Sequence, residues 1–210
     1  MALLPWEPDN LSVTKTAYDV MCNSVFCLKS VMRVKDLMKV ITENSPNGKI
    51  YHGFPVVEGE MSKEGEVKHY GNLVGIISAE HISILLRKKI FMESNGSQTV
   101  QLTIKDYDDS YPAFPNIVEQ LLLIDEEDYP KYIDLRPYMN NAPYTVNEAM
   151  TMTRIFRLFR SIGLRHLPVV DNQNNVRGII TRKDLCRYRF DTKGSMVHVE
   201  ELPFSRKMSS

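Results

Sequence analysis

The 210-residue chain has no surplus of charge of either sign. Lysine and arginine together number 26, aspartate and glutamate also number 26, and the isoelectric point is near 7. A nucleic-acid-binding domain usually carries a basic surplus that neutralises phosphates. The balanced charge therefore argues against nucleic acid as a partner.

Long apolar runs and cysteines are also scarce. The longest apolar runs, NLVGIIS and EQLLLI, are far shorter than the roughly 20 residues that a membrane helix needs. The first residues, MALLPWEPDN, are too polar for a signal peptide, so we expect this segment itself to be soluble. The three cysteines have no spacing typical of a metal site or a disulfide framework, and we expect free thiols at Cys22, Cys27 and Cys186.

No arrangement of residues indicates catalysis. The sequence has no HExxH, no paired cysteine clusters, no Walker A loop and no evident nucleophile with its base. We therefore expect no catalytic residues and no metal site, and we do not expect an enzyme. The acidic run DEED (125–128) is the best metal candidate, but without histidine or a glycine-shaped loop it is more typical of a solvated turn.

What the sequence does have is an internal repeat. GLRHLPVVDNQNNVRGIITRKDLCRYR (163–189) is matched more weakly by HGFPVVEGE and GNLVGIISAEHISILLRKK upstream. The copies are offset by 113 residues at Pro55 and Pro168 but by 103 at Gly75 and Gly178, so the first copy has a longer loop between its strands. Upstream of both, Met21 matches Met139.

Each copy predicts the order strand, helix, strand, strand, helix. Apolar residues recur at helical spacing after the first strand of each copy, at Val34, Leu37, Met38 and Ile41 and at Met152, Ile155, Phe156 and Phe159. We expect Asn147 to cap the second of these helices, Gly163 to end it, and Thr181 to cap a closing helix over 182–190. The closing helix of the first copy is predicted over 79–89, and the apolar PVV and GII strands indicate an α/β layer covered on both faces.

The domain boundaries follow from the repeat. We expect a first repeat over 13–90, an acidic linker over 91–133, a second repeat over 134–195 and a flexible tail over 196–210. The linker is expected to have little regular structure apart from a possible strand at VEQLLLI.

This doubled βαββα unit resembles the tandem cystathionine-β-synthase (CBS) domain, an α+β fold in which two repeats pack with pseudo-twofold symmetry. A narrower resemblance rests on PWE, GFPVVE, DYDDSYPAFPNI, YMNNAPYTV and the run from Arg154 to Arg189. These segments are similar to the C-terminal cytoplasmic region of CLC chloride channels and transporters, in particular the lysosomal and late-endosomal chloride/proton exchangers.

The CLC resemblance implies a regulatory domain on the cytoplasmic face of a membrane, with the ion-transporting part outside this chain. It also implies three partners: that transmembrane part, a second copy through the CBS domains, and an accessory membrane subunit. A free-standing CBS-type adenylate sensor that controls a soluble partner remains the alternative. The PWE and YPAFPNI segments favour the transporter.

In many CBS families the cleft between repeats binds an adenine nucleotide, so ATP is the expected regulatory ligand. The second copy contains the G-x-x-[ST]-x-x-D signature as Gly178, Thr181 and Asp184, where the carboxylate can accept from ribose hydroxyls. The first copy has His81 at the aspartate position, so we expect at most one occupied cleft. The resemblance assigns stacking on the base to Tyr51, which is followed by His52 and Gly53, and the lining of the pocket to Val25 and Phe26. Ile179 belongs to the same candidate site, and Lys183 or Arg182 could supply positive charge for the phosphates. Asp184 as a simple helix-start residue and Tyr51 as a packed strand residue stay open as alternatives.

Overall fold

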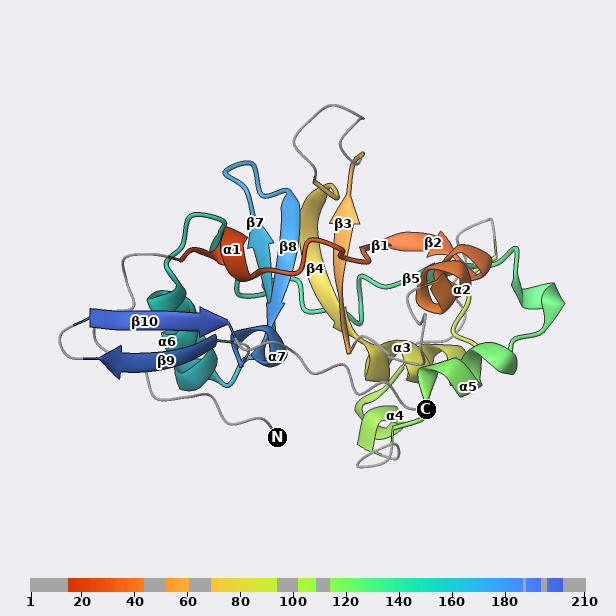
Figure 1. Ribbon diagram of the computed structural model, residues 1–210. Helices are drawn as coiled ribbons and strands as arrows, with labels where there is room; N and C mark the ends of the chain where they lie inside the picture. Colours follow the sequence, from red (N-terminus) through yellow and green to blue (C-terminus); the bar gives the residue numbers. More distant parts are fainter. Residues whose placement is uncertain are drawn as a thin grey trace, which may run out of the picture. The chain divides into compact units, whose positions relative to one another are not determined.

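The computed structural model describes residues 15–43, 52–60, 69–93, 102–108, 114–186, 188–193 and 196–201. The chain divides into two compact units, each considered by itself. The first-repeat unit comprises Phe26–Ser62 and Tyr70–Pro143. The second-repeat unit comprises Met1–Val25, Lys63–His69 and Tyr144–Ser210. Figure 1 labels strands and helices of both repeats.

The sheet of the first-repeat unit has the order β1-β3-β4. β1 runs parallel to β3, and β3 pairs antiparallel with β4. The bounds are Leu28–Lys29 for β1, Gly53–Glu58 for β3 and Asn72–Ser78 for β4. Two helices complete the repeat, α2 (Val34–Glu43) and α3 (Ala79–Arg87). All of β3 except Glu58 is buried, as its apolar sequence predicts for a central strand.

The second-repeat unit has the same topology. Its sheet order is β6-β7-β8, with β6 parallel to β7 and β7 antiparallel to β8. The elements are β6 (Val146–Asn147), α6 (Met152–Ile162), β7 (His166–Val170), β8 (Val176–Thr181) and α7 (Arg182–Leu185). Two βαββα repeats of α+β type are therefore confirmed.

The strand registers show how faithful the repeat is. Pro55 lies opposite Ile76 in the first-repeat unit, and Pro168 lies opposite Ile179 in the second. Both antiparallel pairs also have an irregularity directly after this point, at Val56/Val57 and at Val169/Val170. The sequence offsets measured at the prolines and glycines thus correspond to equivalent positions in two sheets.

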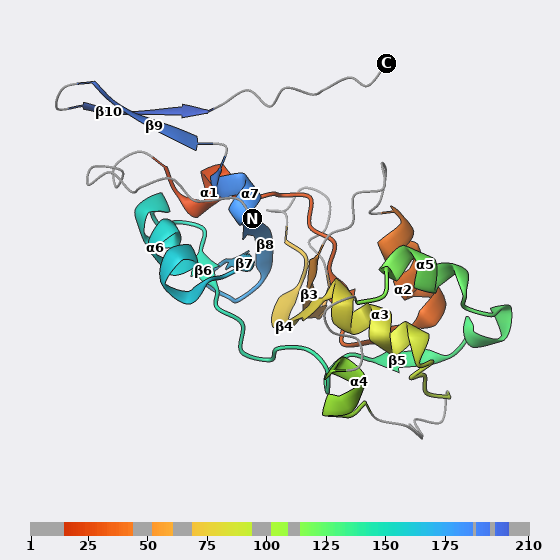
Figure 2. The same cartoon turned by 90° about the horizontal axis from the view of Figure 1, so that it is seen from below.

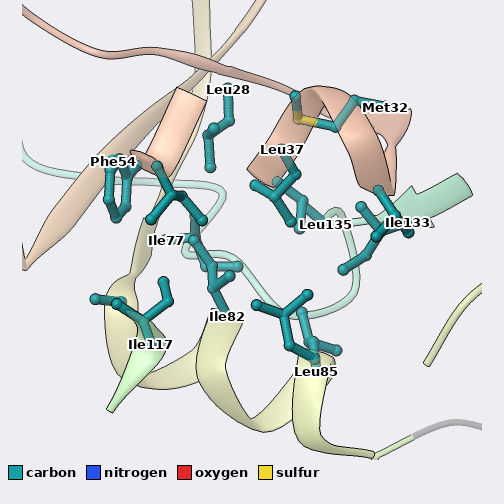
Figure 3. Packing of buried hydrophobic residues seen from close by; sticks show 14 of the residues in the cluster. Leu28, Met32, Leu37, Phe54, Ile77, Ile82, Leu85, Ile117, Ile133 and Leu135 are labelled. Carbon is teal, nitrogen blue, oxygen red and sulfur yellow. The ribbon is translucent and has the colours of Figure 1, made fainter. Parts of the chain in front are cut away.

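The core of the first-repeat unit explains its helical periodicity. Figure 3 shows the buried side chains of Leu28, Leu37, Phe54, Ile77, Ile82 and Leu85 packed together from β1, α2, β3, β4 and α3. Ile117, Ile133 and Leu135, which come from the segment between the repeats, join the same cluster. This segment is therefore part of the core of the first-repeat unit.

The expected strand at VEQLLLI is wrong. Residues Ile117–Leu122 form helix α5, whose N-terminus is capped where Asn116 Oδ1 accepts from Val118 N (3.0 Å). Ile117 and Leu121 are buried at helical spacing. Leu122, from the same apolar run, is on the opposite face of the helix and is 82% exposed.

The inter-repeat segment contains further regular structure that a linker would lack. It includes α4 (Ile104–Asp108), the 3-10 helix η2 (Glu126–Asp128) and β5 (Tyr132–Asp134). β5 pairs antiparallel with β2 (Val31–Arg33). Asp128, from the run expected to be a solvated turn, is buried and forms ion pairs with Lys131 (2.7 Å) and Lys89 (3.1 Å).

Two predicted ends in the second-repeat unit also need correction. Asn147 does not cap α6, since the N-cap position is occupied by Thr151. The side chain of Asn147 instead accepts from Ala149 N (3.0 Å) in a local turn. Gly163 does end the helix, in the left-handed region at φ 71°. The closing helix stops at Leu185, since the chain continues as a hairpin of β9 (Tyr188–Lys193) and β10 (Met196–Glu201). The expected flexible tail is thus a strand over 196–201, and 202–210 lie outside the described residues.

Residues 15–25 belong to the second-repeat unit although the first repeat follows them in the chain. We call them the N-terminal arm. The arm includes α1 (Ala17–Val20), which contacts α6 and β8. Figure 2 shows α1 beside the elements of the second repeat.

Candidate functional site

The junction of β8 and α7 carries four of the predicted nucleotide-binding residues, Ile179, Thr181, Lys183 and Asp184. β8 contains Ile179 and ends at Thr181, and α7 contains Asp184. Thr181 donates to Asp184 Oδ2 through its backbone N–H (2.9 Å) and through Oγ1 (2.6 Å). The predicted cap at Thr181 is confirmed, and the pair forms a capping box that fixes the carboxylate of Asp184 at the start of α7.

The two candidate phosphate contacts differ in their surroundings. Arg182 Nε donates to the carbonyl oxygen of Leu164 (3.0 Å), which ties that side chain to the loop before β7. Lys183 has an exposed side chain in the same short helix. Of the two cations, Lys183 is therefore the one at the protein surface.

Val25 reaches the second-repeat unit through the N-terminal arm. Cys22 N donates to Ile179 O (2.9 Å) and Ile179 N donates to Cys22 O (3.2 Å), so the arm lies antiparallel along β8. Val25 is buried three residues further on. The second-repeat unit thus contains five of the predicted residues, Val25, Ile179, Thr181, Lys183 and Asp184.

The first-repeat unit contains Phe26, His52 and Gly53. Phe26 is half-buried and packs against the core, and the carbonyl of His52 accepts from Ala79 N (3.1 Å) at the start of α3. Gly53 opens β3 opposite Ser78. Tyr51, the predicted base-stacking residue, lies outside the described residues.

The position equivalent to Asp184 is used differently in the first-repeat unit. Ser78 caps α3 by accepting from His81 N (3.2 Å). The ring of His81 is engaged by Tyr138, whose carbonyl lies 3.0 Å from Nδ1, and by Tyr107, whose ring lies edge-on at 4.9 Å between centroids. The imidazole therefore joins α3 to two neighbouring segments, where the second repeat has a carboxylate.

Burial sets the chemistry of the cysteine next to Phe26. Desolvation raises the pKa of the Cys27 thiol to about 12, against a smaller opposite effect of Lys29. Burial also raises the pKa of Cys186, against the nearby positive charge of Arg182. All three cysteines are free, as expected, and Cys27 stays protonated at neutral pH.

Sequence reasoning missed the close contact between a methionine and a glycine in each unit. A Cβ at Gly178 would lie 2.5 Å from Met21 Sδ, and a Cβ at Gly75 would lie 2.7 Å from Met139 Sδ. The signal was present, because Met21 matches Met139 in the repeat just as Gly178 matches Gly75. What the sequence does not show is that Met21 shares a unit with Gly178 and that Met139 shares a unit with Gly75.

The described residues contain no group of three or more His, Cys, Asp or Glu side chains that is arranged to hold a metal ion. Among the helices in the described part of the chain, none combines the length and the apolar character needed to cross a membrane.

Known proteins resemble this chain in a family model, in solved structures and in sequence. A family model described as CBS domain matches residues 134–191. A solved structure of CBSX2 in complex with AMP has a TM-score of 0.48 and 19% sequence identity, covering 83% of this chain and 95% of that one. The family match and the two equivalent repeats define the class: the chain is a tandem CBS-domain protein.

Its sequence relatives are more specific. The chain is 38% identical to the H(+)/Cl(-) exchange transporter 7 of Homo sapiens over 97% of its own length, which is 24% of that protein. It is 32% identical to the chloride channel protein CLC-d of Arabidopsis thaliana over 77% of its length, or 20% of that protein. The chain thus spans about a quarter of the curated relatives it matches, and it fits the CBS region of a CLC protein.

Proposed function

We propose that this chain is the cytoplasmic regulatory module of a CLC-type chloride/proton exchanger and that it responds to an adenine nucleotide, ATP or a close relative. The observation that carries the transporter part is the 38% identity to an H(+)/Cl(-) exchange transporter over 97% of the chain. A similarity this extensive also favours a tethered module over a free-standing adenylate sensor, because it includes the segments on both sides of the repeats.

The residues of the proposed nucleotide site contact different parts of the nucleotide. Tyr51 stacks on the base, and Val25, Phe26 and Ile179 supply the apolar wall. The ribose hydroxyls bind Asp184, and Lys183 faces the phosphates. Backbone groups near His52, Gly53 and Thr181 complete the set.

The capping box is compatible with this role. Both hydrogen bonds from Thr181 end on Oδ2 of Asp184, whereas an ionised carboxylate has about four acceptor positions on its two oxygens. Thr181 therefore holds the carboxylate in place through one of its two oxygens. Asp184 has a structural role and a binding role at once.

One nucleotide per chain is proposed. In the first-repeat unit, the side chain equivalent to Asp184 is His81, whose ring already contacts Tyr138 and Tyr107. An imidazole is also a poorer acceptor for two adjacent hydroxyls than a carboxylate. We therefore propose that the nucleotide binds in the cleft that includes Asp184.

The proposed partners follow from the assignment to a CLC-type exchanger. The module contacts the transmembrane part of its own protein, pairs with a second copy through the CBS domains, and works beside an accessory membrane subunit at the cytoplasmic face of lysosomal or late-endosomal membranes. Nucleotide acts by binding one arrangement of the module more tightly than another. It is sensed and not hydrolysed, since the sequence lacks a Walker A loop.

The test is a transport assay on the full exchanger that contains this region. Exchange currents are recorded with and without ATP in the wild type and in the Asp184→Ala and Tyr51→Ala variants. We expect ATP to change gating in the wild type and the variants to lose that response while still conducting. Wild-type currents that ignore ATP would contradict a nucleotide-sensing role.

A further inference from the structure

We propose that the N-terminal arm, residues 15–25, is coupled to the Asp184 side of the nucleotide site, so that bound nucleotide holds the arm in place and a loosened arm weakens nucleotide binding. This inference rests on the proposed function, because it names how the same site is regulated. It concerns only residues of the second-repeat unit.

The first step is that the arm is firmly attached to this unit. Backbone hydrogen bonds join it to the segment that leads into α6, from Met152 N to Lys15 O (3.0 Å), from Ala17 N to Met150 O (2.8 Å) and from Tyr18 N to Glu148 O (3.0 Å). Ala17, Val20 and Met21 are buried in the second-repeat core. The arm is thus a structural element of the second repeat, although it precedes the first repeat in the sequence.

The second step is that the arm and the nucleotide residues share one strand. Cys22 exchanges two backbone hydrogen bonds with Ile179, at 2.9 and 3.2 Å. Ile179 is two residues before Thr181, which holds Asp184 through both of its donors. Displacing the arm would remove both backbone hydrogen bonds that join Ile179 to Cys22. It would also remove Met21 from Gly178, three residues before Thr181.

The third step is a comparison with the first-repeat unit. There Asn140 takes the place of Cys22, since Asn140 N donates to Ile76 O (2.8 Å) and Ile76 N donates to Asn140 O (3.0 Å). The strand leads to Ser78 and then to His81, which occupies the position of Asp184. The fold therefore requires such a paired segment in both units, but only the arm lies beside a carboxylate that binds nucleotide in our proposal.

The coupling is reciprocal by thermodynamic necessity. If an ordered arm favours nucleotide binding by some factor, bound nucleotide stabilises the ordered arm by the same factor. Val25 strengthens the connection, because it is part of the arm and also one of the proposed wall residues.

The test measures hydrogen exchange in the wild-type chain with and without ATP, after calorimetry has established whether ATP binds. We expect ATP to slow exchange at the amides of Cys22 and Ile179 by about 5-fold or more. In the reciprocal experiment, we expect Met21→Ala to weaken ATP binding by about the same factor. Tyr18→Ala is the matched control, since Tyr18 is on the same arm but 54% exposed, and we expect unchanged affinity.

The outcomes separate the two proposals. No ATP binding to the wild-type chain would overturn the proposed nucleotide site and the coupling with it. ATP binding with unchanged exchange at Cys22 and Ile179 would overturn the coupling alone. The exchange measurement needs no substitution, so it decides the question even if Met21→Ala folds poorly.

Discussion

Met21 lies directly against Gly178, with its sulfur 2.5 Å from where a Cβ at position 178 would stand. The same relationship recurs in the other unit, where the sulfur of Met139 lies 2.7 Å from the corresponding point at Gly75. In each unit a segment that carries a methionine crosses the strand that carries the glycine, and only glycine leaves room for it. Each unit therefore contains a close contact of the same kind.

This packing predicts that alanine is destabilising at both glycines. We expect Gly178→Ala and Gly75→Ala to lower the free energy of unfolding by about 1–3 kcal/mol each, as overpacked cores do. Each new Cβ would also meet a backbone carbonyl, that of Asn140 at 2.8 Å from position 75 and that of Cys22 at 3.0 Å from position 178. Gly75→Ala is expected to cost more, because its carbonyl is nearer. Urea unfolding of the single variants measures the difference.

A double-mutant cycle provides the control. Combining Met21→Ala with Gly178→Ala removes the side chain that the new methyl group meets, so the double variant should be more stable than the sum of the single effects predicts. Strict additivity would mean that the contact between Met21 and Gly178 is not the cause.

The repeat and its order of elements could be predicted from the sequence because they rest on local signals. Apolar spacing located α2 and α6, and Gly163 marked the end of α6 through its left-handed conformation. The strand predicted at VEQLLLI was wrong, since a short continuous apolar stretch fits a strand or a helix equally well until its neighbours are known. Packing of Ile117 and Leu121 on the first-repeat core decides for helix.

A second prediction concerns acid stability. Hydrogen bonds from the backbone of Thr103 and from the side chain of Lys88 lower the pKa of Asp106 from 3.8 to about 2. Because the folded pKa lies below the unfolded one, the stabilisation is fully present above about pH 4 and is lost as the pH falls through 2. The unfolding midpoints of wild type and Asp106→Asn should therefore converge as the pH is lowered from 5 to 2. A constant gap over that range would contradict the assignment.

A third prediction concerns thiol reactivity. Since burial raises the pKa of Cys27 to about 12, its thiolate is scarce at pH 8, and a thiolate is the reactive form. Mass spectrometry after maleimide treatment of the folded chain should show Cys22 modified well before Cys27. Unfolding in urea should abolish the difference. Early modification of Cys27 in the folded chain would show that this thiol is accessible and ionisable.

A fourth prediction concerns the inter-repeat segment. Asp128 is buried between Lys89 and Lys131, so Asp128→Ala should destabilise the chain by about 1–3 kcal/mol. The matched control is Lys39→Ala, which removes an exposed ion pair with Glu43 at 3.8 Å and should cost about 0.5 kcal/mol or less. Equal effects on thermal unfolding would mean that the segment is a linker after all.

The candidate site was only partly within reach of the sequence. The place of Thr181 before the closing helix predicted the cap, but that Asp184 is its capping-box partner was not predicted. The use of His81 by Tyr138 and Tyr107 was not predictable, since those partners are 57 and 26 positions away and meet it only after the inter-repeat segment has packed. Long-range contacts of this kind leave no periodic signal.

Calorimetric titration of the chain with ATP tests the central claim most directly. We expect one ATP per chain, with affinity lowered about 10-fold or more by Asp184→Ala and by Tyr51→Ala, since each removes a principal contact. Asp106→Ala breaks an equivalent threonine–aspartate capping pair in α4 and should leave the affinity unchanged. Two ATP molecules per chain, or binding that is insensitive to both substitutions, would contradict the account.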